Sequence, residues 1–183
     1  ASLKLYGSKP EYTRMVDKYE AKEYVGSIIG NEHIIPTLGV WNSWEEIDFS
    51  KLPDKFVLKC THDCGSTVII RDKNKMNKKE VIDFLQKHLD VRYGYDSCEP
   101  HYIAIEPRVM AESLIEMDNT DEFSSQTTVD HKIRCIDGKA QYDFVCYDRS
   151  LESGSGGSKT VYDLYDIHTW QPMHQYLADP GVE

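Results

Sequence analysis

A lysine within an apolar strand, directly before a turn of small residues, is the feature of this sequence best suited to chemistry. Lys59 follows the apolar run 56–58, and the turn spans residues 61–67. A buried lysine is costly unless an anion meets it. Backbone N–H groups in such a turn can bind phosphate, and a lysine on the strand can neutralise the charge of the phosphate. The segment therefore predicts a phosphate-binding site, although an edge strand with Lys59 facing solvent would give the same pattern.

The same segment alternates cysteine and histidine, residue types that could also bind zinc or form a thiolate–histidine pair. Cys60, His62 and Cys64 are spaced by two, and Cys98 and His101 follow further along the chain. Zinc sites favour these residue types, but the usual spacing of their cysteine pairs is met only loosely, and alternating residues share a face only in a regular strand. We expect no metal site here. A thiolate pair of Cys64 with His62 or His101 has no signature to support it, so we interpret the cysteines as buried or incidental.

A mixture of helices and hairpins must position these residues. We expect helices over residues 17–29 and 77–89, the first ended by Gly30, and a short helix opened by a capping box at residues 43–46. The expected strands are 34–41, 55–61, 67–71, 108–116, 129–136, 140–147 and 160–169, with residues 93–102 as a loop. Asp137-Gly138 predicts a two-residue hairpin turn. Because there is no regular βαβ alternation, the sequence predicts an α+β fold.

Composition narrows the class of protein. The chain has 183 residues, and its 21 Lys+Arg against 31 Asp+Glu give a net charge of −10, which argues against general nucleic-acid binding without forbidding a local basic pocket. No apolar run approaches the roughly 20 residues of a membrane span, so we expect no membrane insertion. The five cysteines are scattered and odd in number. They read as free thiols and favour a cytoplasmic location.

Four blocks of sequence, in order and spacing, resemble a known family. They are residues 12–25, residues 35–41 leading to 52–53, the Lys59 strand and turn continuing to residue 75, and residues 107–116 with 130–132 and 137–139 downstream. Together they resemble the TupA-like branch of the ATP-grasp superfamily, which is associated with cell-surface polymer biosynthesis. The resemblance covers roughly residues 3–149. It implies an ATP-grasp-type α+β fold, with antiparallel or mixed sheets, helices on one face, and Lys59 and Glu112 lining one cleft.

The resemblance also implies a site for ATP and Mg²⁺. Lys18 and Lys59 would contact the phosphates, and the turn that carries His62, Gly65 and Ser66 would fold over them. A surface helix is the alternative for Lys18.

At the other end of the nucleotide, Glu112 would accept a hydrogen bond from the adenine amino group, unless it pairs with a nearby lysine or arginine. The backbone near Ser113 and Ile115 would meet the ring edge. Asp118 is a candidate for the ribose hydroxyls, and Lys132 is a candidate on the substrate side.

Two departures from the family pattern bear on activity. The family's turn reads His-Gly-Ser-Gly, whereas this chain has a carboxylate at Asp63, which restricts the turn and could repel phosphate. The Mg²⁺-binding Glu/Asn cluster of the family's C-terminal part is not found in this chain. Asp163 and Asp166 are three apart on an expected strand, so they point to opposite faces. The chain as given is therefore expected to be inactive.

These observations give a domain organisation and a function. We expect an N-terminal helix and linker strand segment (1–54), a nucleotide-binding subdomain (55–149), a flexible Gly/Ser loop or engineered linker (150–158) and a C-terminal strand and tail (159–183). The implied parent is an ATP-dependent ligase that joins a small carboxylate or polymer acceptor to an amine through an acyl phosphate, in surface-polysaccharide or peptidyl-polymer biosynthesis. The alternative is a non-catalytic nucleotide-binding or protein-interaction domain.

Overall fold

The computed structural model describes residues 9–96, 98–116, 129–147 and 161–173, and it divides the chain after Leu114 into two compact units. The division lies inside the segment 55–149, which was expected to form one subdomain. Asp118 and the Gly/Ser segment 153–158 lie outside the described residues. In the described ranges, no helix combines the length and the apolar character needed to cross a membrane.

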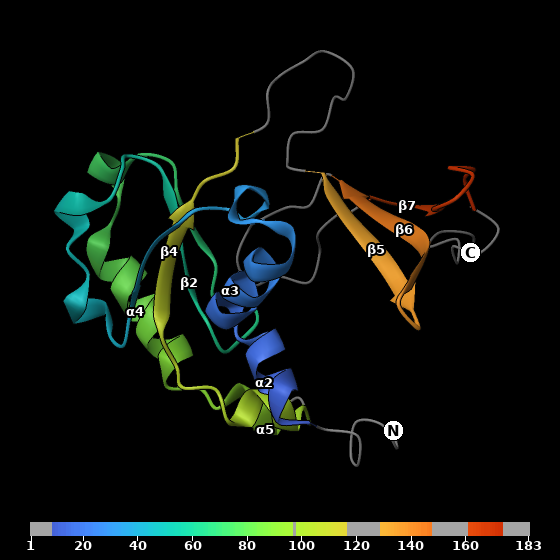
Figure 1. The fold of residues 1–183 in the computed structure, drawn as a ribbon. Helices are drawn as coiled ribbons and strands as arrows, with labels where there is room; N and C mark the ends of the chain where they lie inside the picture. Colours follow the sequence, from blue (N-terminus) through green and yellow to red (C-terminus); the bar gives the residue numbers. More distant parts are fainter. Residues whose placement is uncertain (1–8, 97, 117–128, 148–160, 174–183) are drawn as a thin grey trace, which may run out of the picture. The chain divides into compact units, whose positions relative to one another are not determined.

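The first unit is built on a four-stranded antiparallel sheet with the strand order β1-β4-β2-β3. Its strands are β1 (Thr37–Trp41), β2 (Phe56–Cys60), β3 (Val68–Ile70) and β4 (Val109–Ser113). The two central strands, β2 and β4, are those expected to carry Lys59 and Glu112. Their adjacency confirms that both residues belong to one small sheet (Figure 1).

Helices flank this sheet, and local capping explains the starts of two of them, α3 and α4. They are α2 (Pro10–Val16), α3 (Lys18–Ile29), α4 (Lys78–Leu89), α5 (Tyr93–Asp96) and α6 (Pro100–Ile103), with 3₁₀ helices η1 (Asn31–His33), η2 (Trp44–Glu46), η3 (Phe49–Lys51) and η4 (Lys73–Lys75). Asp17 caps α3 by accepting from the N–H groups of Tyr19 and Glu20, and Asn77 caps α4.

Two local expectations are corrected. Residues 93–102 are not a loop, because α5 and α6 form there, and Pro100 stands at the first position of α6, where its missing N–H is harmless. The short helix at Trp44 does form, but the Ser43 side chain does not cap it. Glu46 instead accepts from the N–H of Asn42, so the contact lies one residue earlier than a capping box requires.

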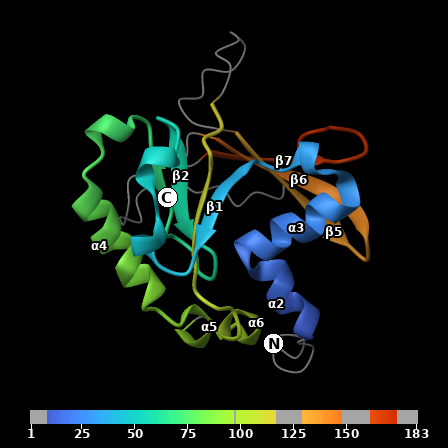
Figure 2. The same cartoon turned by 60° about the vertical axis from the view of Figure 1, so that its left-hand side comes forward.

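The core of the first unit lies between the sheet and α4. Leu85 of α4 is fully buried and belongs to one cluster with Phe56, Leu58 and Cys60 of β2. Because alternate residues of a strand face opposite sides, Val57 and Lys59 face away from this core. Figures 1 and 2 show α4 on one side of the sheet and α3 on the other. The side that carries Lys59 therefore faces α3.

The second unit holds a three-stranded antiparallel sheet, β5-β6-β7, formed by β5 (Asp130–Ile136), β6 (Lys139–Tyr147) and β7 (Val161–Asp166). Asp137 and Gly138 both have positive φ, at 50° and 74°, which confirms the predicted hairpin turn. Asp163 lies opposite Val145 and Asp166 opposite Tyr142. The two carboxylates are thus on opposite faces of β7, as expected. The two sheets and the accompanying helices confirm the α+β class, but helices lie on both faces of the first unit's sheet and not on one face as expected.

Candidate functional site

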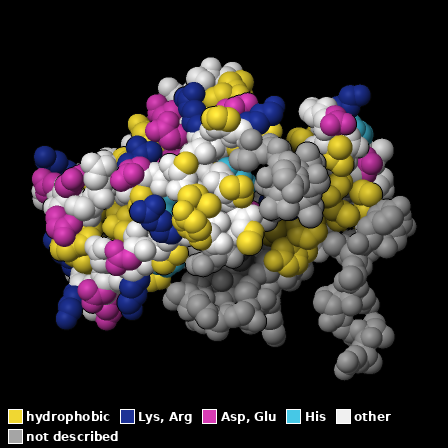
Figure 3. Space-filling model, turned by 90° about the horizontal axis from the view of Figure 1, so that it is seen from below, with side chains coloured by type: hydrophobic (Ala, Val, Ile, Leu, Met, Phe, Trp, Pro, Cys, Tyr) yellow, Lys and Arg dark blue, Asp and Glu magenta, His cyan; other side chains and the backbone are white. Residues whose placement is uncertain are grey.

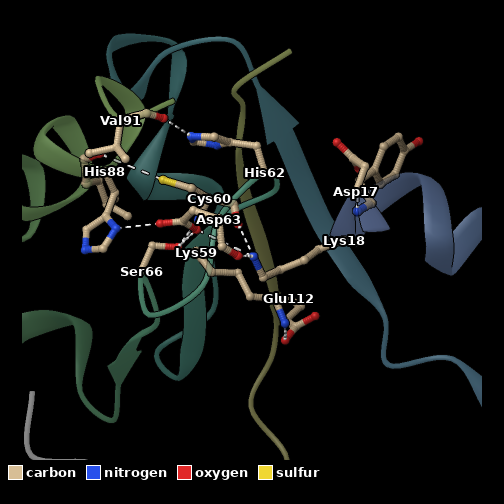
Figure 4. A network of polar contacts seen from close by, with 12 residues as sticks. Asp17, Lys18, Lys59, Cys60, His62, Asp63, Ser66, His88, Val91 and Glu112 are labelled. Carbon is tan, nitrogen blue, oxygen red and sulfur yellow. Dashed lines mark hydrogen bonds and ion pairs between the residues drawn. The ribbon is translucent and has the colours of Figure 1, made fainter. Parts of the chain in front are cut away.

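Two lysines and one glutamate meet on the side of the central strands that faces α3. Glu112 lies directly across from Val57, so it shares a face with Lys59 and is its diagonal neighbour. The Lys59 ammonium donates to Oε1 of Glu112 (Figure 4), and Lys22 of α3 donates to Oε2 at 2.8 Å. Each carboxylate oxygen of Glu112 therefore accepts a hydrogen bond from a lysine. Of the two interpretations of Glu112 from sequence, the structure shows the pairing with lysine, and its contact with adenine stays a prediction.

This cluster is largely shielded from water. Glu112 is 6% exposed. Burial alone would raise the pKa of its carboxyl, but hydrogen bonds from Lys22 and Lys59 and their positive charges outweigh burial and bring that pKa below its ordinary value. Glu112 is consequently held as the anion. The arrangement fixes the Lys59 ammonium in place, which a lysine on an edge strand facing solvent would not show.

Lys18 of α3 is bound to the turn that follows β2. Its ammonium donates to the carbonyl oxygen of Cys60 at 2.9 Å and to that of Asp63, and it lies 3.5 Å from Oδ1 of Asp63. Its backbone N–H donates to the Thr61 carbonyl at 2.9 Å. The start of α3 is thus anchored to the turn through main chain and side chain alike. Lys18 is therefore not simply a surface residue of its helix.

Asp63 points into the turn and organises it. The Ser66 hydroxyl donates to Oδ1 of Asp63 at 2.5 Å, and Nδ1 of His88 lies 2.5 Å from Oδ2 (Figure 4). Ser66 in turn accepts from the N–H of Cys60 at 2.9 Å. The carboxylate is buried among these partners and Lys18. The repulsion of phosphate expected from its charge is consequently reduced by the cation beside it.

The tip of the turn presents backbone rather than bulky side chains. Gly65 has a φ of 98°, in the left-handed region that favours glycine. Within the described part of the chain, the N–H groups of Asp63, Cys64 and Gly65 have no hydrogen-bond acceptor. Thr61 Oγ1, at the start of the turn, is also buried without a partner among the described residues. Donors of this kind, next to Lys18, suit a phosphate group.

His62 belongs to a different neighbourhood. Its Nε2 hydrogen-bonds to the Val91 carbonyl at 3.0 Å, and its ring forms part of the wall of a cavity of about 470 Å³ between the end of α4, α6 and residues 42–43. Asp90, Arg92 and Tyr102 also line this cavity. The turn therefore borders this cavity through His62, whereas Lys59 does not line the cavity.

The cysteines near the turn do not gather. Cys60 is fully buried with its thiol 3.8 Å from the Leu85 carbonyl, whereas Cys64 is exposed. Burial, reinforced by the nearby Asp63 charge, raises the pKa of the Cys60 thiol to about 12, so Cys60 is neither a thiolate nor a nucleophile near neutral pH. Among the described residues, no three His, Cys, Asp or Glu side chains come together as ligands for a metal ion.

The remaining predicted site residues lie apart or outside. The Ser113 N–H is bound to the Pro36 carbonyl at 3.0 Å, and Ile115 is 54% exposed at the start of the second unit. Lys132 is also in the second unit, where its ammonium lies 3.3 Å from Asp130. Asp118 is outside the described residues. The structure thus brings together, within the first unit, Lys18, Lys59, Gly65, Ser66 and Glu112, with His62 on the adjoining cavity.

Sequence reasoning missed two members of the site. Lys22 is four residues after Lys18, a spacing that places both on one face of α3, and this spacing could have revealed it. His88 is in the last turn of α4, and its only local signal is its position on a helix that faces the core. Its contact with Asp63 joins residues 25 apart in sequence. No motif predicts such a contact.

The residues fit ATP better than they fit Mg²⁺. The lysines and the turn supply cations and N–H donors for phosphate. A magnesium ion prefers six oxygen ligands. The oxygens of Glu112 are already bound to two lysines, and those of Asp63 to Ser66 and His88, so neither carboxylate is left open for a metal ion. On the face seen in Figure 3, the acidic and basic side chains of the described residues are intermingled.

Comparisons with known proteins give the family. The family model described as TupA-like ATPgrasp matches residues 1–171. Neither a search of curated proteins nor a search of solved structures returns a match. The family match extends beyond residues 3–149, which the four sequence blocks span. Because it spans most of the 183 residues, the chain belongs to the TupA-like ATP-grasp family.

Proposed function

We propose that this chain is the ATP-binding part of a ligase that activates a carboxylate with ATP and joins it to an amine, in the assembly of a surface polysaccharide or peptidyl polymer. The observation that carries the proposal is the convergence of Lys18, Lys22 and Lys59 beside a turn with unpaired N–H groups. Family membership supports the ATP-grasp ligase chemistry. The polymer comes from the family's association with surface polymers and awaits its own test.

In the proposed reaction, the chain's residues act through charge and position. Lys18 and the N–H groups of the turn would bind phosphate oxygens, and Lys59 would neutralise charge that develops as the terminal phosphoryl group leaves. Mg²⁺ supplies further neutralisation of the phosphates in ATP-grasp chemistry. The described carboxylates do not form a site for it, so no role in holding it is assigned to them.

The test is calorimetric titration of the chain with ATP, with and without Mg²⁺, for the wild type and for Lys59→Ala. Loss of one charge-assisted contact is expected to weaken binding about 10- to 100-fold. Lys79→Ala, which removes an exposed lysine of α4, is the matched control and should bind as the wild type does. Absence of binding at millimolar ATP would favour the protein-interaction domain instead.

The expected inactivity of the chain as given is a separate question. It is tested by release of ADP from ATP with Mg²⁺ and candidate carboxylate and amine acceptors. Robust turnover that Lys59→Ala abolishes would contradict it.

A further inference from the structure

We propose that Asp63 and His88 are positioning residues for phosphate binding, and that His88 takes up a proton when Lys18 moves from Asp63 to a bound phosphate. The inference rests on the proposed function, because it requires that a nucleotide binds at the turn. It assigns Asp63 and His88 to that site and predicts that a proton is taken up when the nucleotide binds.

The buried carboxylate of Asp63 is the group that the other residues of this arrangement contact. The Asp63 side chain is 1% exposed and has partners from three parts of the fold. Ser66 donates from within the turn at 2.5 Å, Lys18 of α3 lies at 3.5 Å, and Nδ1 of His88 of α4 lies at 2.5 Å. Asp63 therefore connects the turn to the two helices on either side of the sheet. If these contacts are lost, the turn loses its internal support.

Lys18 is the partner that a phosphate would compete for. Its side chain is 28% exposed, and two of its contacts are to backbone carbonyls of the turn and its preceding strand. An ammonium group has three donors that can be redirected. The unpaired N–H groups of Asp63, Cys64 and Gly65 lie in the same turn. A phosphate bound to them would attract the Lys18 ammonium away from the Asp63 carboxylate.

Withdrawal of Lys18 would leave the carboxylate short of positive charge. Its other partners are the neutral Ser66 hydroxyl and His88. A buried carboxylate without a cation is strongly destabilising. His88 can correct this, because its Nδ1 faces Asp63 while its side chain is 26% exposed, so solvent can deliver a proton to the other ring nitrogen. The proton comes from the buffer, and the charge lost by the withdrawal of Lys18 is replaced.

Other groups near His88 do not supply that charge. From β2, the Cys60 thiol stays neutral because burial raises its pKa to about 12. From α4 itself, the nearest ring is Phe84, with centroids 4.6 Å apart. From α3, Lys18 is the cation already described. Among the printed partners of the Asp63 carboxylate, His88 is therefore the one whose protonation can match the movement of Lys18.

The experiment is titration of the full chain with MgATP at pH 7.5 in two buffers of different ionisation enthalpy, which yields the number of protons bound with the nucleotide. The wild type is expected to take up a substantial fraction of one proton per ATP. His88→Gln should abolish that uptake. Asp63→Asn should abolish it as well, because a neutral amide needs no cation. His33→Gln is the matched control, since that histidine is 61% exposed on η1, and it should retain the uptake.

The outcomes separate the inference from the proposed function. Binding of ATP with heats that do not depend on the buffer would overturn the inference and leave the proposed function standing, as would His88→Gln with unchanged uptake. No binding of ATP or of tripolyphosphate would overturn both. Circular dichroism of each variant identifies any that fail to fold. Where a variant fails to fold, nuclear magnetic resonance of the His88 ring in the wild type, with and without ATP, takes the place of that variant. Ring resonances that ATP leaves unchanged would overturn the inference.

Discussion

The pairing of Glu112 with two lysines predicts an unequal response to removing its members. In Lys59→Met, Glu112 keeps Lys22 at 2.8 Å, so one charge-assisted hydrogen bond is lost. In Glu112→Gln, two ammonium groups are left facing each other without their anion. Glu112 is the more damaging residue to change, because it is the partner shared by both lysines.

The magnitudes follow from the burial of the pair. The side chains of Lys59 and Glu112 are 19% and 8% exposed, which lies between a surface ion pair, worth under about 1 kcal/mol, and a buried one, whose disruption costs about 3–5 kcal/mol. We expect Lys59→Met to lower the free energy of unfolding by about 2 kcal/mol and Glu112→Gln by about 3 kcal/mol. The double variant should show a coupling of about 1.5 kcal/mol.

The assay is urea unfolding followed by tryptophan fluorescence. Trp41 and Trp44 lie in the first unit, and a Trp170→Phe background removes the signal of the second unit. Lys79→Met is the control and should change the free energy of unfolding by less than about 0.5 kcal/mol. A coupling below about 0.5 kcal/mol, or an equal effect of Lys79→Met, would refute the reasoning.

The same pair gives the sign of a pH dependence. The pKa of Glu112 in the folded chain is below its ordinary value of 4.5, so its contribution to stability is fully present above that value. The contribution is lost as the pH falls through the lowered pKa. The advantage of the wild type over Glu112→Gln should therefore shrink only in acid. An advantage that grows as the pH falls below about 4.5 would contradict the pairing.

Two further predictions concern the start of α3 and the thiols. Asp17→Ala removes two capping hydrogen bonds of 2.8 Å each and the 3.2 Å ion pair with Arg108, so urea unfolding should show that the free energy of unfolding falls by about 2 kcal/mol. Asp17→Asn should lower this free energy by less, because asparagine keeps the cap. Equal losses in the two variants would contradict this. Cys64 should react with a maleimide in the native chain, and Cys60 only after unfolding, as peptide mass spectrometry can measure; native labelling of Cys60 at the rate of Cys64 would show that its burial is wrong.

Local signals predicted the elements that depend on neighbours in sequence. The Asp137-Gly138 turn formed because both residues tolerate positive φ, and the helix expected over residues 77–89 formed with Asn77 as its cap. The adjacency of the Lys59 and Glu112 strands could be expected only through the family, because periodicity does not give strand order. The sheet order β1-β4-β2-β3 is non-sequential.

The contacts that complete the site are long-range, and local rules could not give them. Lys22 and Glu112 are 90 residues apart, and Asp63 and His88 are 25 apart. Asp63 was the residue most difficult to interpret from sequence. As a type it suggests repulsion of phosphate, but its effect depends on where its side chain points. That direction is set by Ser66 and by the two helices packed beside the turn.

Charge in the first unit gives a physical reason for both carboxylates. Lys18, Lys22 and Lys59 carry three positive charges, and Asp63 and Glu112 carry two negative ones, so the five groups sum to +1 in a chain whose net charge is −10. Without the carboxylates, three ammonium groups would repel one another and spread. With them, the lysines are held in position before an anion arrives. A phosphate must then compete with a carboxylate for each lysine, so affinity reflects the difference between the two contacts. By this reasoning, neutralising Asp63 while keeping its hydrogen bonds should strengthen phosphate binding, whereas removing its side chain should weaken it.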